Sequence, residues 1–229
     1  MSGLNVQGIV FDLDATLINL GGFVEWRKAH EEIVENYLEL DCDDETVAAC
    51  SAKGLFTMLE EMYENLQDQR GGEEARSVQN SAYDILSGFE EKGVESCTLM
   101  DGCVNTLDWV KKKGIPMGIC TSNSLKSAEA ALHLQGLNHY FKAVVGRTVD
   151  FPMKPHPAQL VECFRQISVE PSRGVMVGDS HKDIIAGKKA GAFTIGVPVY
   201  FTRLELMKDA DVDVIINNLN ELPAVLEGL

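Results

Sequence analysis

The sequence predicts an α/β protein in which helices cover both faces of a parallel sheet and an all-helical segment is inserted near the N-terminus. Two observations lead to this fold class. After about residue 97, short apolar runs alternate with helix-length segments, which is typical of a parallel sheet. Before that point, residues 20–97 show long amphipathic periodicity of helical type. The 229 residues, 45% of them hydrophobic, can fill one large domain with an insertion.

The elements follow in order from these patterns. Residues 8–13 form a short apolar run, so we expect a strand that is buried on both faces. The inserted segment should contain helices separated near residues 41–44 and 71–72, where Asp and Gly cluster. The alternating part is expected to contain helices over 101–113, 125–135, 157–167, 181–190 and 219–226, and strands over 115–120, 143–146, 174–177, 193–197 and 214–216.

The net charge of −15 is concentrated in the inserted segment. Residues 20–97 hold 19 Asp and Glu against 6 Lys and Arg, a net charge of −13, whereas the rest of the chain has a net charge of −2. Such an acidic surface disfavours nucleic acid and anionic membranes as partners, because their phosphates bind cationic patches. A solvated helical surface explains the same charge equally well.

Apolar stretches in the chain are far shorter than the roughly 20 residues that span a bilayer. Residues 1–7 lack the basic start and apolar core of a secretory signal, so we expect a cytoplasmic protein. The cysteines show no C-x-x-C pair and no spacing typical of a zinc site, which favours buried free thiols over disulfides. They are Cys42, Cys50, Cys97, Cys103, Cys120 and Cys163.

Two carboxylates end the first expected strand. Asp12 and Asp14 are one residue apart, so in an extended backbone their side chains point to the same face. Like charges this close require a proton, a metal ion or a cation. The alternative is a turn in which Asp14 and Thr16 cap the next helix, and the pair alone does not decide between the two.

Further polar residues follow other expected strands. Thr121 comes after the strand 115–120, and its hydroxyl at a helix N-terminus could cap the helix or bind an anion. Lys154 precedes a proline, which keeps it out of helical geometry and presents it from extended chain. Asp179 ends the strand 174–177, and Asp183 lies in the next helical turn, where it could also form a capping box with Ser180.

These residues together make a magnesium phosphate site. If they converge, Asp12, Asp14, Asp179 and Asp183 carry four negative charges, which a divalent cation and Lys154 would largely neutralise. Mg²⁺ prefers carboxylates, carbonyls, waters and substrate phosphate as ligands. We therefore expect Mg²⁺ as the cofactor.

On these motifs, the chain resembles the haloacid dehalogenase superfamily of hydrolases, most closely its phosphoglycolate phosphatase branch. Its four motifs match FDLDATL at 11–17, CTSN at 120–123, KP at 154–155 and GDSHKD at 178–183. The resemblance implies a Rossmann-like, doubly wound parallel sheet as catalytic core, formed by residues 1–19 and 98–229. It also implies that residues 20–97 form a helical cap domain.

The resemblance assigns a role to each matched residue. It implies that Asp12 is the nucleophile and Asp14 the general acid and base, and that Thr121 and Lys154, with Ser122 and Asn123, hold the phosphoryl group. It implies that Asp12, Asp14 through its backbone carbonyl, Asp179 and Asp183 ligate Mg²⁺. The family usually has glycine where this chain has Ala15. We expect a backbone there that does not need positive φ, so that the exchange is minor.

The resemblance implies a Mg²⁺-dependent phosphatase that hydrolyses a small phosphomonoester, of the phosphoglycolate or sugar phosphate type, through an aspartyl phosphate. Asp14 argues against a dehalogenase, because family members with that activity lack this second aspartate. The alternatives are a β-phosphoglucomutase-like phosphotransferase and a non-catalytic binding protein on the same fold. We expect a monomer or homodimer whose partner is a small phosphorylated metabolite.

The inserted segment should set substrate choice, because a cap that closes over the site touches the leaving group. Its cationic candidates Arg27, His30 and Lys53 are each more typical of an exposed surface. The charge of −13 weakly favours a substrate that is not polyanionic.

Overall fold

The computed structural model describes residues 6–199 and 201–229, and a six-stranded parallel sheet forms its centre. The strand order is β5–β4–β1–β6–β7–β8. Its strands are β1 (Gly8–Phe11), β4 (Met117–Ser124), β5 (Phe141–Arg147), β6 (Gly174–Gly178), β7 (Phe193–Gly196) and β8 (Val214–Ile215). The central strand β1 pairs with β4 through Ile9 and Met117, and with β6 through Phe11 and Val177. The predicted sheet is confirmed.

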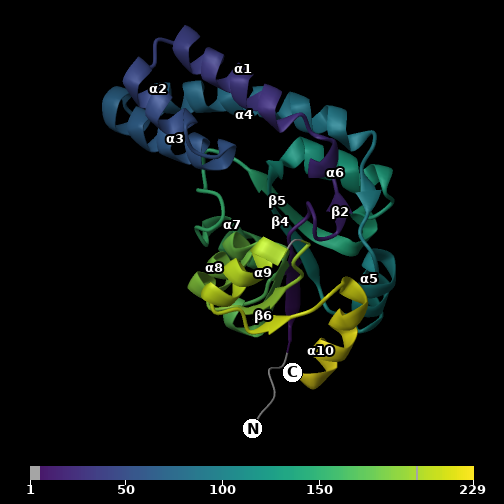
Figure 1. Cartoon of the computed structure of the whole chain (residues 1–229). Helices are drawn as coiled ribbons and strands as arrows, with labels where there is room; N and C mark the ends of the chain where they lie inside the picture. The colour runs from purple at the N-terminus through teal and green to yellow at the C-terminus, as the bar shows by residue number, and fades with distance from the viewer. Residues whose placement is uncertain (1–5, 200) are drawn as a thin grey trace.

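Helices cover both faces of this sheet (Figure 1). They are α5 (Cys103–Lys112), α6 (Leu125–Leu134), α7 (Ala158–Gln166), α8 (His181–Ala190), α9 (Phe201–Asp209) and α10 (Leu222–Gly228). Because side chains alternate along a strand, Ile9 and Phe11 join the core cluster that contains residues of α5, α6 and α10. Val10 points the other way and packs with residues of α7 and α8.

The helical insertion follows β2 (Ile18–Asn19) and returns through β3 (Thr98–Leu99), and the two strands pair antiparallel at its base. Between them run α1 (Trp26–Glu39), α2 (Asp44–Ser51), α3 (Leu55–Arg70) and α4 (Gly72–Val94). Figure 1 shows these four helices packed together beyond the carboxyl edge of the sheet. The division into a core of 1–19 and 98–229 and a cap of 20–97 stays a prediction, and residues 1–5 lie outside the described part.

The helix breaks expected in the insertion are present. Helix α1 ends at Glu39, and α2 begins at Asp44. Asp43 caps the start of α2, because its side chain accepts a hydrogen bond of 2.8 Å from the backbone N–H of Thr46. Helices α3 and α4 are separated by Gly71, whose φ of 82° suits only glycine well.

Several elements differ from the sequence expectation. Strand β4 runs from Met117 to Ser124 instead of 115–120, so Thr121 lies on an irregular strand end, and Ser124 instead caps the following helix α6. Helix α9 was not predicted. The short 3-10 helices are η1 (Gly21–Phe23), η2 (Asn138–Tyr140), η3 (Pro171–Arg173) and η4 (Leu219–Glu221). All six cysteines are buried free thiols, as expected. Within the described residues, helices with the length and apolarity needed to cross a bilayer are absent.

Candidate active site

The predicted site residues converge on one cavity. Strands β1, β4 and β6 are adjacent and parallel, so the residues that follow them meet at one edge of the sheet. A cavity of about 310 Å³ lies at this edge. Its lining includes Asp12, Asp14, Thr121, Ser122, Asn123, Lys154, Asp179 and Asp183. The structure therefore brings together every residue that the sequence singled out for the site.

Lys154 is the cation at the centre of this cluster. Its Nζ atom lies 2.5 Å from Asp12 Oδ1 and 2.5 Å from Asp183 Oδ1, and it also donates to the carbonyl oxygen of Cys120 at 2.9 Å. The lysine is buried, so the two ion pairs are shielded from water. Burial alone would lower the pKa of Lys154, but Asp12 and Asp183 outweigh it and raise that pKa above its usual range.

A metal ion fits beside this lysine. Carboxylate oxygens of Asp12, Asp179 and Asp183 lie within 4.8 Å of one another, and all three residues are buried. Three clustered carboxylates are a donor set for a hard divalent ion such as Mg²⁺. The guanidinium of Arg203, from α9, contacts Asp179. The carboxylate of Asp14 lies outside the cluster, so a contribution of Asp14 to metal binding would come from its backbone carbonyl.

Crowding of charge shifts the proton affinity of Asp12. The pKa of Asp12 is raised to about 7 as the net result of burial, which raises it most, of Lys154, which lowers it, and of the charges of Asp183 and Asp14, which raise it. A bound cation favours the ionised carboxylate. A divalent cation bound beside Asp12 would therefore lower this pKa and favour the ionised carboxylate at neutral pH.

Asp14 is held in a different environment. Its Oδ1 atom accepts the backbone N–H groups of Gly21 at 2.7 Å and Leu20 at 2.9 Å. Burial raises the pKa of Asp14, and the hydrogen bonds from Gly21 and Leu20 partly oppose this. The two aspartates that ended the first strand thus have separate partners: Asp12 faces a lysine, and Asp14 faces backbone amides. A carboxyl group with raised pKa suits proton transfer near neutral pH.

Ala15 adopts a φ of 60°. The expectation that this position avoids positive φ is wrong. The turn that carries the chain away from the site forces this conformation, because Ala15 N–H bonds to the carbonyl of Ile18 at 2.7 Å. A Cβ atom in left-handed backbone is strained, which explains why glycine suits the position better.

Asp183 combines two functions that the sequence left as alternatives. Its Oδ2 atom accepts the backbone N–H of Ser180 at 3.0 Å and the Ser180 hydroxyl at 2.7 Å, as a residue of the capping box of α8. Its Oδ1 atom bonds Lys154. Gly178 makes room for this carboxyl group, because a Cβ atom there would lie 2.4 Å from Asp183. The helix cap therefore fixes the position of one carboxylate of the cluster.

Thr121 and Asn123 form a compact polar unit on β4. The Thr121 hydroxyl donates to Asn123 Oδ1 at 3.0 Å, and the Asn123 backbone N–H donates to Thr121 Oγ1 at 3.2 Å. Both residues are buried, and Ser122 between them is partly exposed. They line the same cavity as Asp179 and Asp183, and β1 lies between β4 and β6 in the sheet.

The sequence did not point to several other lining residues. Trp26 of α1 and Phe56 of α3 lie with ring centroids 5.8 Å apart and reach the cavity from the insertion. Lys182 lies 5.9 Å above the Phe56 ring, and Arg203 lines both this cavity and an adjoining one of about 470 Å³. The sequence positions of these four residues form no pattern that would predict a shared cavity.

The cationic candidates of the insertion lie elsewhere. Arg27 pairs with Glu31 and Lys53 with Glu61, and both cations are exposed. His30 is half-buried. Neither cavity counts Arg27, His30 or Lys53 among its lining residues.

The comparisons with known proteins agree with this arrangement. The model of the haloacid dehalogenase-like hydrolase family matches residues 9–197. Pyrophosphatase PpaX of Anoxybacillus flavithermus is 27% identical over 97% of this chain and 98% of its own length.

Solved structures share the fold over nearly the whole chain. CbbY of Rhodobacter sphaeroides in complex with phosphate covers 95% of this chain and 96% of its own, with a TM-score of 0.61 and 21% identity. β-Phosphoglucomutase of Clostridium difficile covers 95% of this chain and 93% of its own, with a TM-score of 0.64 and 18% identity. From its match over most of its length, and from the aspartate–lysine cluster at the carboxyl edge of its sheet, this chain belongs to the haloacid dehalogenase-like hydrolases.

Proposed function

We propose that the protein is a Mg²⁺-dependent phosphatase that hydrolyses a small phosphomonoester, of the phosphoglycolate or sugar phosphate type, with Asp12 as nucleophile. The observation that supports this most strongly is the contact between Lys154 and Asp12 inside a buried carboxylate cluster. A lysine bound to the attacking carboxylate can neutralise the charge that gathers when a phosphate dianion enters.

In the first step, an oxygen of Asp12 attacks phosphorus, and the bond from phosphorus to the leaving oxygen breaks. Asp14 donates its proton to that oxygen, and the alcohol leaves. In the second step, water attacks the phosphorus of the aspartyl phosphate, Asp14 takes a proton from the water, and phosphate leaves with Asp12 restored. Asp14 suits both steps better than a free carboxyl group, since burial raises its pKa above the usual value and so favours the protonated form that the first step needs.

The residues that would hold Mg²⁺ are Asp12, Asp179 and Asp183, with the backbone carbonyl of Asp14 beside them. When bound, the ion supplies positive charge next to the phosphoryl oxygens. Lys154 and the polar groups of Thr121, Ser122 and Asn123 would hold the remaining phosphoryl oxygens. All of these groups line one cavity, which supports a common role in positioning the phosphoryl group for transfer.

Pyrophosphate hydrolysis is a second candidate, and two cations favour it. Lys182 and Arg203 line the cavity in addition to Lys154. A leaving group that is itself a phosphate would have cationic partners there. The sequence similarity to pyrophosphatase PpaX points in the same direction. This candidate runs against the expectation, drawn from the acidic insertion, that the substrate is not polyanionic. The charges that line the cavity carry more weight, because they act on the substrate at shorter range and with less screening than charges on the outer surface.

The activity test compares wild-type protein with Asp12→Asn and with Asp68→Asn, a control at an exposed aspartate. Phosphate release from p-nitrophenyl phosphate, small metabolite monoesters and pyrophosphate is measured with and without Mg²⁺. We expect Mg²⁺-dependent release that Asp12→Asn abolishes and Asp68→Asn preserves. Appreciable turnover by Asp12→Asn would refute the assigned nucleophile.

The same substrates separate the remaining alternatives. A sugar phosphate that yields an isomer instead of free phosphate would indicate a mutase. If pyrophosphate is the preferred substrate, Arg203→Gln should lower kcat/KM for pyrophosphate more than for p-nitrophenyl phosphate. An equal effect on both substrates would remove the support that Arg203 gives to the second candidate.

A further inference from the structure

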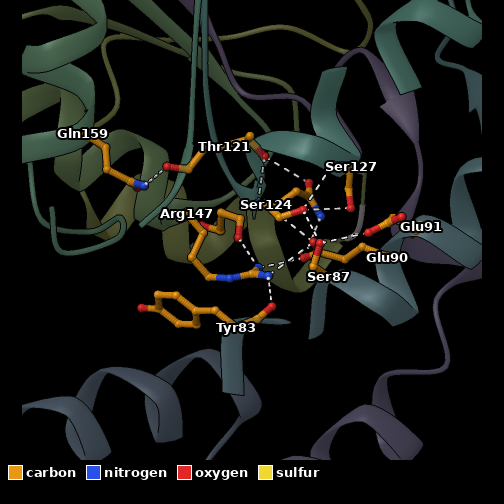
Figure 2. A network of polar contacts seen from close by, with 12 residues as sticks. Tyr83, Ser87, Glu90, Glu91, Thr121, Ser124, Ser127, Arg147 and Gln159 are labelled. Carbon is orange, nitrogen blue, oxygen red and sulfur yellow. Dashed lines mark hydrogen bonds and ion pairs between the residues drawn. The ribbon is translucent and has the colours of Figure 1, made fainter. Parts of the chain in front are cut away.

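Glu90 of α4 and Arg147 at the end of β5 form a fully enclosed ion pair (Figure 2). Arg147 Nη1 lies 2.7 Å from Glu90 Oε1, and the side chains of both residues have no exposed surface. One residue belongs to the helical insertion and the other to the sheet. Burying two charges requires removal of their hydration, so an apolar pair of similar size is often as stable or more so. Stability alone therefore gives little reason for this pair.

The ion pair contacts three consecutive residues of the polar strand end of β4. Arg147 Nη1 donates to the carbonyl oxygen of Ser122 at 2.7 Å. Glu90 Oε2 accepts the backbone N–H of Ser124 at 2.9 Å, and Glu90 Oε1 accepts the side-chain amide of Asn123 at 3.3 Å. Figure 2 shows these bonds meeting at the two charged groups. The pair thus fixes the backbone on both sides of Asn123.

These contacts also determine how Thr121 is oriented. An ionised carboxylate can only accept hydrogen bonds, so Asn123 must turn its NH₂ group toward Glu90. Its Oδ1 atom then faces Thr121 and accepts the hydroxyl proton at 3.0 Å. The backbone N–H of Asn123 returns a bond to Thr121 Oγ1 at 3.2 Å. A chain of hydrogen bonds therefore links Glu90 to the hydroxyl that lines the cavity.

A second contact reinforces the link between α4 and β4. The hydroxyl groups of Ser87 and Ser124 lie 2.9 Å apart, and Ser124 Oγ also donates to Ser127 Oγ at 2.8 Å at the start of α6. Arg147 further stacks on the Tyr83 ring of α4, with 5.1 Å between its guanidinium carbon and the ring centroid. Helix α4 therefore holds this strand end through several side chains around one buried charge pair.

We propose that Glu90 and Arg147 are positioning residues for the phosphoryl group: the pair holds Ser122, Asn123 and Ser124 so that Thr121 and the adjacent polar groups face the bound phosphate. This inference rests on the proposed function in taking phosphate as the ligand of the strand end. It assigns to the helical insertion a part in building the phosphate site, in addition to covering it. Without the pair, the segment remains on β4 and loses its fixed orientation.

The test uses the full chain and two variants. Glu90→Gln keeps the shape of the side chain, but it removes the charge and leaves Arg147 buried without an ionised partner. The double variant Glu90→Leu with Arg147→Met removes both charges at similar volume, a replacement that buried ion pairs often tolerate. Glu91→Gln is the matched control: Glu91 is partly exposed next to Glu90, pairs with Lys126 at 2.8 Å and accepts the Ser87 hydroxyl at 3.3 Å. A glutamine oxygen can still accept from Ser87, so this variant removes a charge and keeps that hydrogen bond.

Binding of inorganic phosphate to the Mg²⁺-loaded protein is measured by calorimetry, together with KM, kcat and the affinity for Mg²⁺. We expect phosphate binding to weaken about tenfold or more in both Glu90 variants, the scale of effect seen when supporting residues of a site are removed. KM should rise accordingly. The affinity for Mg²⁺ should stay within about twofold, because the metal ligands lie on other strands. Glu91→Gln should match the wild type throughout.

The proposal fails if the folded double variant binds phosphate and shows KM within about twofold of the wild type, since a loosened site should cost much more. It also fails if phosphate and Mg²⁺ affinities fall together, which indicates general disruption. Wild-type protein that binds phosphate but hydrolyses none of the tested substrates would refute the proposed function. In that case the phosphate affinities alone still decide on Glu90 and Arg147.

Discussion

Lys154 Nζ lies 2.5 Å from Asp12 Oδ1, although the two residues are 142 positions apart in the sequence. The same Nζ atom lies 2.5 Å from Asp183 Oδ1, so one cation joins the end of β1 to the first turn of α8. This contact makes the aspartate cluster electrostatically possible in the absence of a metal ion.

Lys154→Met should remove the positive charge and leave the buried carboxylates to repel each other. We expect kcat to fall by about 10²- to 10³-fold, the effect of removing one preorganised electrostatic contact. The pKa of Asp12, already raised to about 7, should rise further. Lys126→Met is the control, because Lys126 is exposed and forms an ion pair with Glu91. Equal kcat for Lys154→Met and the control would contradict this assignment.

Mg²⁺ binding should depend on pH through Asp12. The pKa of Asp12 is about 7 in the metal-free folded protein and ordinarily 3.8. Between these two pH values, the folded protein keeps a proton on Asp12 that the unfolded chain has lost. Between these values, the contribution of Asp12 to the free energy of unfolding falls as pH rises. Mg²⁺ needs the ionised carboxylate, so its affinity should increase with pH up to about 7 and then level off.

Calorimetry of Mg²⁺ binding in buffers of different ionisation enthalpy measures the released proton directly. The proton release should be largest on the acidic side of the Asp12 pKa and should disappear in Asp12→Asn. An affinity that is the same at mildly acidic and mildly alkaline pH would show that Asp12 does not lose a proton when the ion binds.

Ala15→Gly should stabilise the protein, because glycine adopts a φ of 60° without a strained Cβ atom. We expect the free energy of unfolding to rise by about 0.5–1 kcal/mol, since the gain of roughly 1–2 kcal/mol in strain is partly offset by the freedom of glycine in the unfolded chain. Ala52→Gly is the control at an ordinary φ of −66°, and it should destabilise. Urea unfolding of both variants measures the difference, and a loss of stability in Ala15→Gly would contradict the account.

Gly21→Ala should impair the acid–base role of Asp14. A Cβ atom at Gly21 would lie 2.3 Å from Asp14 Oδ2, so the carboxyl group must move away from the two amides that hold it. We expect kcat to fall about 10²-fold, within the usual range for general acid–base catalysis. Mg²⁺ affinity should change little. Gly54→Ala is the control, because a Cβ atom there meets no other group within 4 Å.

The core of the site was predictable because the sequence placed it at strand ends. Asp12, Thr121 and Asp179 follow apolar runs directly, and parallel strands bring such positions to one edge of a sheet. Asp183 shows the limit of local reasoning. Its spacing from Ser180 predicts a helix cap, and its position near Asp179 predicts a site residue. In the structure, one oxygen of the carboxylate accepts from Ser180 and the other from Lys154, so the side chain makes both contacts.

The remaining parts depend on contacts that the sequence pattern does not encode. Glu90 is one of several acidic residues of α4, and only the fold shows that this one is buried against Arg147. Arg203 lies on α9. This helix was not predicted from the sequence because residues 198–200, which precede it, contain no Ser, Thr, Asp or Asn that would indicate a helix start. The backbone of Ala15 was predicted wrongly because its positive φ depends on the turn that follows, and an alanine in the sequence does not indicate a positive φ.

The central claim is that Asp12 carries the phosphoryl group during turnover. The most direct measurement is to quench the Mg²⁺-loaded protein during turnover of its best substrate and to treat it with borohydride, which reduces an acyl phosphate to an alcohol. Peptide mass spectrometry then locates the product. The account predicts homoserine at position 12, dependent on substrate and Mg²⁺. Phosphate release with an unmodified Asp12, or with the modification at another aspartate, would contradict it.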